Sequence, residues 1–175
     1  MRDIAFCTSA FAHPDTFIYS EYMLAALLWA LVYADESYLL VNRAPLIYES
    51  GVRWEAERPT GQSACKGGNG QERFLGVSQI LEDGVADCED VASWRIAELR
   101  IGRGTHLKGP PPRAGHPEVT EVPVPWPMMP KGPSVVPGFF KREIAPGSWL
   151  IHIVVCWPNG YIEDPSRALG MGGEA

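Results

Sequence analysis

The chain has 175 residues, a formal net charge of -6 at pH 7 and 16 prolines. This length fits a single domain that buries its own core without disulfide staples. The acidic balance argues against a nucleic-acid-binding surface, which needs clustered Lys and Arg to neutralise phosphates. The four cysteines lie far apart without a C-x-x-C pair, so they form no zinc-ribbon or redox motif and are expected to be free thiols in a reducing compartment. They are Cys7, Cys65, Cys88 and Cys156.

The N-terminal part of the chain predicts an arm followed by a long helix. Residues 1–16 show no sustained period and are interpreted as an irregular arm, whereas residues 17–40 are rich in helix formers. The longest apolar run, residues 23–34, lies between Glu21 and Asp35 and has about half the ~20 residues that a membrane span requires. We therefore interpret it as a buried helix. The N-terminus lacks the basic, apolar and small-residue order of a signal peptide, so we expect no secretion.

Three segments precede the next strong helix. Residues 46–57 carry apolar and aromatic residues at irregular spacing and predict no single element. Residues 58–70 are rich in glycine and predict a loop. Residues 74–81 predict a short helix that ends at the Glu-Asp-Gly of residues 82–84.

A cysteine stands at the beginning of the next helix. Apolar residues fall on one face of residues 88–101, and the glycines at 102 and 104 supply a C-terminal stop. Asp87 is the predicted N-cap residue, with its carboxylate accepting hydrogen bonds from first-turn amides. Cys88 then lies where the helix dipole and the amides favour a thiolate. The neighbouring acids oppose this effect, and a buried small residue at a helix start is the alternative interpretation of Cys88.

Residues 107–137 contain ten of the 16 prolines. Such a segment forms neither a helix nor a central strand, because each proline removes a backbone donor and fixes φ. We interpret it as an insertion that is either a flexible linker or an extended arm laid against a partner, two forms that share one composition. Within it, residues 119–126 alternate apolar residues with polar residues or proline and predict an edge strand.

The C-terminal part predicts a β-hairpin whose turn has two readings. Residues 150–157 are β-branched and bounded by turn residues, and residues 161–164 are the expected partner strand. One reading is a two-residue type I′ turn at Asn159 and Gly160. The other places Pro158 and Asn159 at the centre of a type I turn, with Gly160 in the left-handed position of a bulge. We favour the second because it suits the fixed φ of proline.

The two turns place one carboxylate on different faces of the sheet. With the two-residue turn, Asp164 lies opposite Val155 and points away from His152. With the three-residue turn, Asp164 lies opposite Val154, on the face of His152 and diagonal to it, at roughly 5–8 Å between Cβ atoms. Only the second register lets the two side chains meet. Cys156 is expected to be a core residue.

A thiol at a helix N-terminus, an imidazole on a strand and a carboxylate on the neighbouring strand form a nucleophile, a base and an orienting group. The histidine takes the proton of the thiol, and the carboxylate fixes the histidine tautomer. The candidate catalytic residues are Cys88, His152 and Asp164.

On these residues the sequence resembles the transglutaminase-like superfamily of cysteine enzymes, which present Cys, His and Asp in this order. The matching motifs are GVADCEDVASWR around Cys88, WLIHIVV around His152 and GYIEDPSR around Asp164. Together with PLIYESGVRWEAE at residues 45–57, they look like transglutaminase-like proteins encoded by tailed bacteriophages. The motifs cover about a third of the chain.

The resemblance implies a single α+β domain over residues 1–175. Its transglutaminase-like or papain-like core would follow N-terminal helices and pack the cysteine helix on a small antiparallel sheet carrying the histidine and the aspartate. The implied function is thiol-dependent acyl transfer or hydrolysis on protein or peptide amides, as a protease, an amidase or a crosslinking enzyme. The alternative is a structural component of a phage head, neck or tail that contacts other virion proteins through residues 107–137.

The resemblance also implies a location and a cation site. We expect the host cytoplasm or the virion, with neither nucleic acid nor membrane as a partner. Acyl transfer by this constellation requires no cofactor. In periplasmic proteases of the superfamily, acids around a similar DCED motif bind calcium, which makes a calcium site of four acids here: Asp83, Asp87, Glu89 and Asp90.

The YESGVRW stretch at residues 48–54 has two interpretations. It is either a salt-linked element, through Glu49 and Arg53, that packs against the Cys88 helix, or a wall of the acyl site to which Tyr48 or Trp54 contributes.

Overall fold

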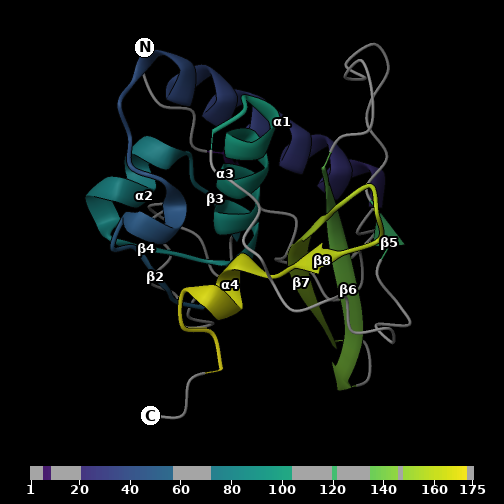
Figure 1. Ribbon diagram of the computed structural model, residues 1–175. Helices are drawn as coiled ribbons and strands as arrows, with labels where there is room; N and C mark the ends of the chain where they lie inside the picture. The colour runs from purple at the N-terminus through teal and green to yellow at the C-terminus, as the bar shows by residue number, and fades with distance from the viewer. Residues whose placement is uncertain are drawn as a thin grey trace.

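The computed structural model describes residues 6–8, 21–56, 72–103, 120–121, 135–145 and 148–172, which form a mixed α+β fold (Figure 1). The elements in chain order are β1 (Phe6–Thr8), α1 (Glu21–Val41), the 3-10 helix η1 (Ile47–Glu49), β2 (Arg53–Trp54), β3 (Glu72–Phe74), α2 (Val77–Asp83), β4 (Val85–Ala86), α3 (Cys88–Arg100), β5 (Thr120–Glu121), β6 (Val136–Ala145), β7 (Ser148–Cys156), β8 (Ile162–Glu163) and α4 (Pro165–Ala168).

Helix α3 is the centre of the molecule. It packs against β7 and β6 of an antiparallel sheet with the order β5-β6-β7-β8, and against α1 and α2. In Figure 1, α3 stands between that sheet and the group formed by α2, β2 and β4. Two small sheets complete the fold, an antiparallel pair of β1 with β3 and a parallel pair of β2 with β4. The predicted packing of the cysteine helix on a small antiparallel sheet is confirmed.

Helix α3 is buried on more than the one face on which its apolar residues fall. Every residue from Glu89 to Glu98 is buried, because neighbouring elements cover the helix on several sides. Its polar residues must therefore find partners inside the protein, since an unpaired buried polar group is costly. Asp87 is the N-cap residue, as predicted, but its side chain makes no capping hydrogen bond.

Long-range strand pairing corrects two further predictions. Part of the N-terminal arm, Phe6–Thr8, is a strand that pairs with β3. Because Phe74 belongs to β3, the helix predicted from residue 74 begins only at Val77. It ends as predicted at Gly84, which adopts a left-handed φ of 71°. The pairing of β1 with β3 is not visible in local periodicity.

The edge strand predicted within residues 119–126 is confirmed for β5, which occupies the edge of the four-stranded sheet. The loop predicted at residues 58–70, the rest of the N-terminal arm and most of residues 107–137 lie outside the described residues. The interpretation of the proline-rich segment as a linker or an arm therefore stays a prediction.

Helix α1 contributes a large part of the core. Leu28, Leu31 and Val32 are fully buried, whereas Leu40 and Val41 at its end are exposed. The window Leu24–Val41 is long and apolar enough to cross a membrane, a property that the core helix of a globular protein shares. In this structure the helix packs along α3.

Asp35 is a buried acid on α1. It is 1% exposed, and its Oδ1 accepts a hydrogen bond from the backbone N–H of Val77 at 2.9 Å. Burial raises the pKa of Asp35 well above its usual range, although the hydrogen bond from Val77 lowers it and the charge of Glu36 raises it further. The folded protein therefore holds this proton more tightly than the unfolded chain does.

Replacing Asp35 with Asn should make the protein relatively more stable as the pH rises. The folded pKa is raised, so the wild type loses stability above the unfolded value of about 3.9, whereas Asn has no proton to lose. The difference in unfolding free energy between Asp35→Asn and wild type should grow by up to about 1.4 kcal/mol per pH unit. Urea unfolding from pH 4 to pH 8 measures it. Asp83→Asn, at an exposed residue, is the control, and a flat difference for Asp35→Asn would contradict the prediction.

Candidate active site

The hairpin turn adopts the three-residue form. Gly160 N–H donates to the carbonyl of Trp157 at 2.9 Å, so Pro158 and Asn159 are the central turn residues. Gly160 has a φ of 80°, and Trp157 N–H donates to the carbonyl of Tyr161 at 2.8 Å. A left-handed residue after a type I turn costs little for glycine.

This turn sets the register that we favoured from the sequence. Val155 lies opposite Glu163, so Asp164, the next residue, lies opposite Val154 and on the sheet face of His152. The predicted meeting of the two side chains is confirmed: His152 Nε2 lies 3.0 Å from Asp164 Oδ2. The two side chains are only 17% and 19% exposed.

Asp164 and His152 are each held by further contacts. Asp164 is the N-cap residue of α4, and its Oδ1 accepts from the backbone N–H of Arg167 at 3.2 Å. The Arg167 guanidinium lies 3.4 Å from Oδ2. On the neighbouring strand, Phe140 is the cross-strand partner of His152, and the two rings stack with centroids 6.1 Å apart. These contacts fix both the carboxylate and the plane of the imidazole.

The geometry assigns roles to the two ring nitrogens of His152. An ionised Asp164 can only accept hydrogen bonds, so Nε2 must carry the proton that it shares with Oδ2. In the neutral ring, Nδ1 then has the lone pair. Nδ1 is therefore the nitrogen that can take a proton from a nucleophile, while Asp164 stabilises the resulting imidazolium.

Cys88 is the first residue of α3 and is partly exposed. Its thiol donates to Glu89 Oε2 at 3.2 Å. A carboxylate that accepts from the thiol favours the neutral S–H form, in opposition to the helix N-terminus, which favours the thiolate. A nucleophilic thiolate at this position would therefore require a base that removes the thiol proton.

Backbone hydrogen bonds link two of the three candidate segments, the entry to α3 and the segment that begins with Asp164. Glu55 N–H donates to the carbonyl of Ala86, two residues before Cys88, at 2.9 Å. The adjacent Trp54 N–H donates to the carbonyl of Leu169, which follows α4, at 3.0 Å. Strand β2 therefore ties the entry to α3 to the segment that begins with Asp164. In Figure 1 the lower end of α3 lies beside α4 and the end of β8.

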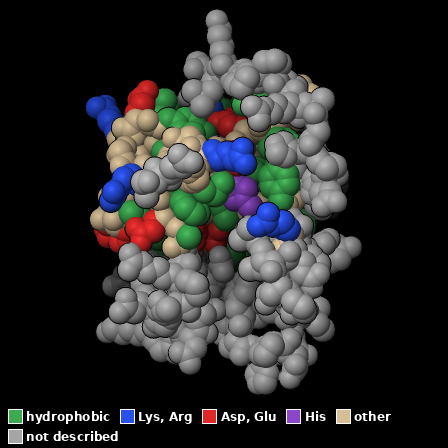
Figure 2. Space-filling model, turned by 90° about the horizontal axis from the view of Figure 1, so that it is seen from below, with side chains coloured by type: hydrophobic (Ala, Val, Ile, Leu, Met, Phe, Trp, Pro, Cys, Tyr) green, Lys and Arg blue, Asp and Glu red, His purple; other side chains and the backbone are tan. Residues whose placement is uncertain are grey.

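Figure 2 shows this end of the molecule from below. A histidine side chain reaches the surface there, with hydrophobic side chains on both sides and Lys or Arg side chains next to it. His152 is the one histidine among the described residues, and it is partly exposed. A small part of the imidazole is therefore exposed at this end of the described structure.

The acids around Cys88 are mostly buried. Asp90 is 1% exposed, and its Oδ1 accepts from Leu75 N–H at 2.6 Å. Burial raises the pKa of Asp90 well above its usual range, and the charge of the hydrogen-bonded Asp87 raises it further. A hydrogen bond between two carboxyl groups needs a proton on one of them, which acts in the same direction.

The proposed calcium ligands lie in different surroundings. Asp83 is exposed at the end of α2, where it accepts from Gln79, whereas Asp87, Glu89 and Asp90 are buried at the start of α3. Within the described ranges, no group of three or more His, Cys, Asp or Glu side chains is arranged to hold a metal ion. The cation site implied by the resemblance stays a prediction.

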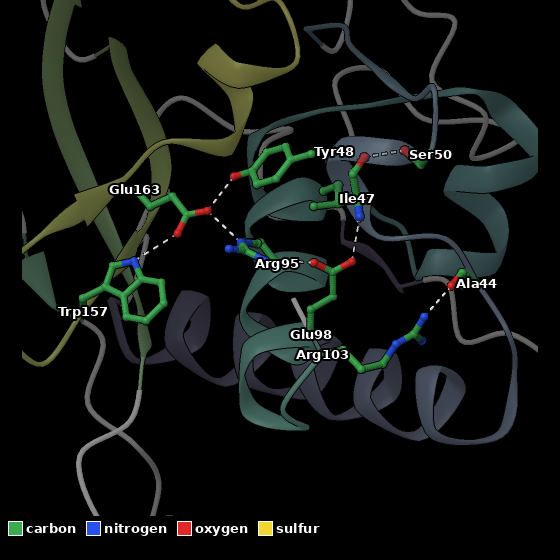
Figure 3. Close-up of polar contacts among 9 residues, drawn as sticks. All are labelled: Ala44, Ile47, Tyr48, Ser50, Arg95, Glu98, Arg103, Trp157 and Glu163. Atoms are coloured by element: carbon green, nitrogen blue, oxygen red, sulfur yellow. Dashed lines mark hydrogen bonds and ion pairs between the residues drawn. The ribbon is translucent and has the colours of Figure 1, made fainter. Parts of the chain in front are cut away.

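Sequence reasoning missed a buried polar network beside the site, drawn in Figure 3. Glu163 Oε1 accepts from Tyr48 Oη at 2.6 Å and from Arg95 Nε at 2.7 Å, and its Oε2 accepts from Trp157 Nε1 at 3.0 Å. Glu163 is 3% exposed and Arg95 is 2% exposed. Burial lowers the pKa of Arg95, but the charge and hydrogen bond of Glu163 outweigh it, so the guanidinium stays charged.

The network continues along α3. Arg95 also donates to Glu98 Oε2 at 3.2 Å, and Glu98 Oε1 accepts from Ile47 N–H at 2.7 Å. The Arg95 guanidinium lies over the ring of Tyr48, 5.2 Å from its centroid. Four elements thus contribute residues around the buried acids Glu98 and Glu163. These elements are η1, α3, β7 with the turn that follows it, and β8.

The packing interpretation of residues 48–54 is confirmed in part. The stretch does pack on α3, but through Tyr48 and the neighbouring Ile47, because Glu49 and Arg53 are exposed. Trp54 is half-buried in β2, and its place in the wall of an acyl site stays a prediction. Cys156 is buried, as expected. Strand alternation was the one sequence signal for the network, because it places the side chains of Glu163 and Asp164 on opposite faces of the sheet.

Nitrogen NMR of the imidazole tests the assigned proton positions. The neutral ring of His152 should be the Nε2–H tautomer, because Asp164 accepts that proton. Asp164→Ala should yield a mixture of tautomers, whereas Asn159→Ala in the same hairpin should leave the Nε2–H form dominant. A dominant Nδ1–H form in the wild type would be incompatible with the geometry.

Comparisons of the chain with protein-family models, curated proteins and solved structures give no match. The evidence for function is therefore the chemistry of the site.

Proposed function

We propose that this protein is a transglutaminase-like thiol enzyme that transfers or hydrolyses acyl groups of peptide or protein amides. The observation that carries the proposal is the 3.0 Å contact between His152 Nε2 and Asp164 Oδ2 on a hairpin packed beside the helix that begins with Cys88. A carboxylate that fixes the imidazole in the Nε2–H form leaves Nδ1 as a general base.

The reaction follows from these roles. Cys88 Sγ attacks the carbonyl carbon of an amide while its proton passes to His152 Nδ1, and Asp164 stabilises the imidazolium. His152 then gives the proton to the leaving amine as the C–N bond breaks, which leaves a thioester on Cys88. Water or a second amine attacks the thioester carbonyl while His152 takes the proton of that nucleophile. The C–S bond then breaks, the acyl product leaves, and His152 returns the proton to the Cys88 sulfur. The N-terminus of α3 favours the negative charge that develops on the carbonyl oxygen.

Glu89 is the local obstacle to this chemistry and explains why a base is needed. In the resting protein its carboxylate accepts a hydrogen bond from the Cys88 thiol, with 3.2 Å between Sγ and Oε2. The thiolate forms readily only when an imidazolium balances the added negative charge. The proposal therefore makes the reactivity of Cys88 depend on His152 rather than on the helix end alone.

Alkylation with iodoacetamide tests the proposal. At pH 6 an ordinary cysteine is almost fully protonated, so labelling of Cys88 in the wild type should be faster than that of Cys7, Cys65 and Cys156, read by peptide mass spectrometry. His152→Ala should slow Cys88 labelling by about tenfold or more, because the thiolate loses its counter-ion.

The matched variants separate the roles of the three groups. Asp164→Asn should reduce Cys88 labelling less than His152→Ala does, because the imidazole remains, and Cys88→Ser should abolish it. Labelling of Cys88 that is independent of His152 across pH 5 to 9 would rule out the proposed base.

A further inference from the structure

We infer that Glu163 is a positioning residue, whose buried ion pair with Arg95 fixes the His152–Asp164 pair relative to the helix that begins with Cys88. This inference rests on the proposed function, because it concerns the alignment of the base with the nucleophile. Glu163 acts from the opposite face of the hairpin and belongs to none of the three candidate catalytic groups.

Glu163 and Asp164 are neighbours in the chain, and their side chains point to opposite faces of the hairpin. Glu163 lies opposite Val155 and reaches Arg95 of α3, whereas Asp164 lies opposite Val154 and reaches His152. Successive side chains of a strand alternate between the two faces, so the position of one determines the position of the other. Holding Glu163 against α3 therefore holds Asp164 against the imidazole.

The register that the turn sets is supported by few backbone pairs in β8. Strand β8 has two residues, and its pairing with β7 involves Val155 with Glu163 and Cys156 with Ile162. A shift of one residue would turn Asp164 to the other face and carry Glu163 away from its partners. Such a shift would leave the charge of Arg95 buried without its counter-ion, which is strongly unfavourable.

The partners of Glu163 come from the elements that surround the site. Arg95 lies two turns along α3 from Cys88, Tyr48 belongs to η1, and Trp157 follows directly after β7. Both carboxylate oxygens are used, and the residue is 3% exposed. The network thus relates the nucleophile helix to the base strand through one side chain.

The test uses Glu163→Gln in the full chain. Glutamine keeps the size of the side chain and can still accept hydrogen bonds, but it removes the charge that pairs with Arg95. The Cys88 labelling rate at pH 6 should fall toward that of His152→Ala, about tenfold, and the Nε2–H bias of the His152 ring should weaken. A merely structural role would lower stability without changing either measurement.

Glu36→Gln is the matched control. Glu36 pairs with Arg100 and joins α1 to the other end of α3, so its loss also removes one ion pair of the same helix. This variant should be destabilised while keeping the wild-type pH profile of Cys88 labelling. Tyr48→Phe covers the case in which Glu163→Gln fails to fold: it removes one 2.6 Å hydrogen bond to Glu163 and should change both measurements in the same direction, but less.

The outcomes distinguish failure of the positioning role of Glu163 from failure of the proposed function. If wild-type labelling depends on His152 but folded Glu163→Gln and Tyr48→Phe both keep the wild-type profile and tautomer, the positioning role is wrong and the proposed function stands. If wild-type labelling is independent of His152, the proposed function fails. The tautomer measurement then still decides whether Glu163 positions the His152–Asp164 pair.

Discussion

The buried ion pair between Arg95 and Glu163 is the constraint on which the arrangement of this protein depends. It joins the central helix to the last strand of the sheet, and both residues are almost fully shielded from water. A buried pair contributes little net stability compared with apolar residues, but breaking it costs about 3–5 kcal/mol. We infer that its main contribution is conformational specificity. Either charge would be strongly unfavourable in the core without the other, so the pair favours the one arrangement in which the two residues meet.

The surroundings of the pair show how the protein accommodates charge in its core. Burial raises the pKa of Glu98, but the N–H of Ile47 and the Arg95 guanidinium lower it again. Tyr48 has a pKa raised by burial and by the adjacent Glu163, so its hydroxyl remains a donor. A second buried system lies at the other side of α3, where Asp35 and Asp90 accept from the backbone N–H groups of Val77 and Leu75. Acids thus fasten α1 and α3 to the segment that enters α2.

The hairpin register could be predicted from the sequence because local dihedral preferences determine it. Proline at the first central position and glycine in the left-handed position admit one turn, and the turn determines which residue faces His152. The meeting of His152 and Asp164 followed from three consecutive residues. The helix beginning at Cys88 was likewise readable, because periodicity and a glycine stop are local signals. The α+β class was an expectation from the family resemblance.

The network around Glu163 could not be predicted for the opposite reason. Arg95 is 68 residues away in the sequence and Tyr48 is 115 residues away, and no periodicity links them. Periodicity likewise did not reveal the burial of Arg95, because a charged side chain gives no local sign of a partner that is distant in the sequence. The pairing of β1 with β3 was also not predicted, because the two strands are far apart in the sequence. Contacts of this kind arise from the assembled fold.

The separation of the Arg95–Glu163 ion pair from the thiol has a consequence for descent. Cys88 donates a hydrogen bond to its own neighbour Glu89, whereas Glu163 bonds to Arg95, Tyr48 and Trp157. Under the proposed function, a lineage in which serine replaced this cysteine would lose the reactive sulfur but keep every residue of the ion pair. Inherited shape and inherited reactivity would then be separable traits, because different residues carry them.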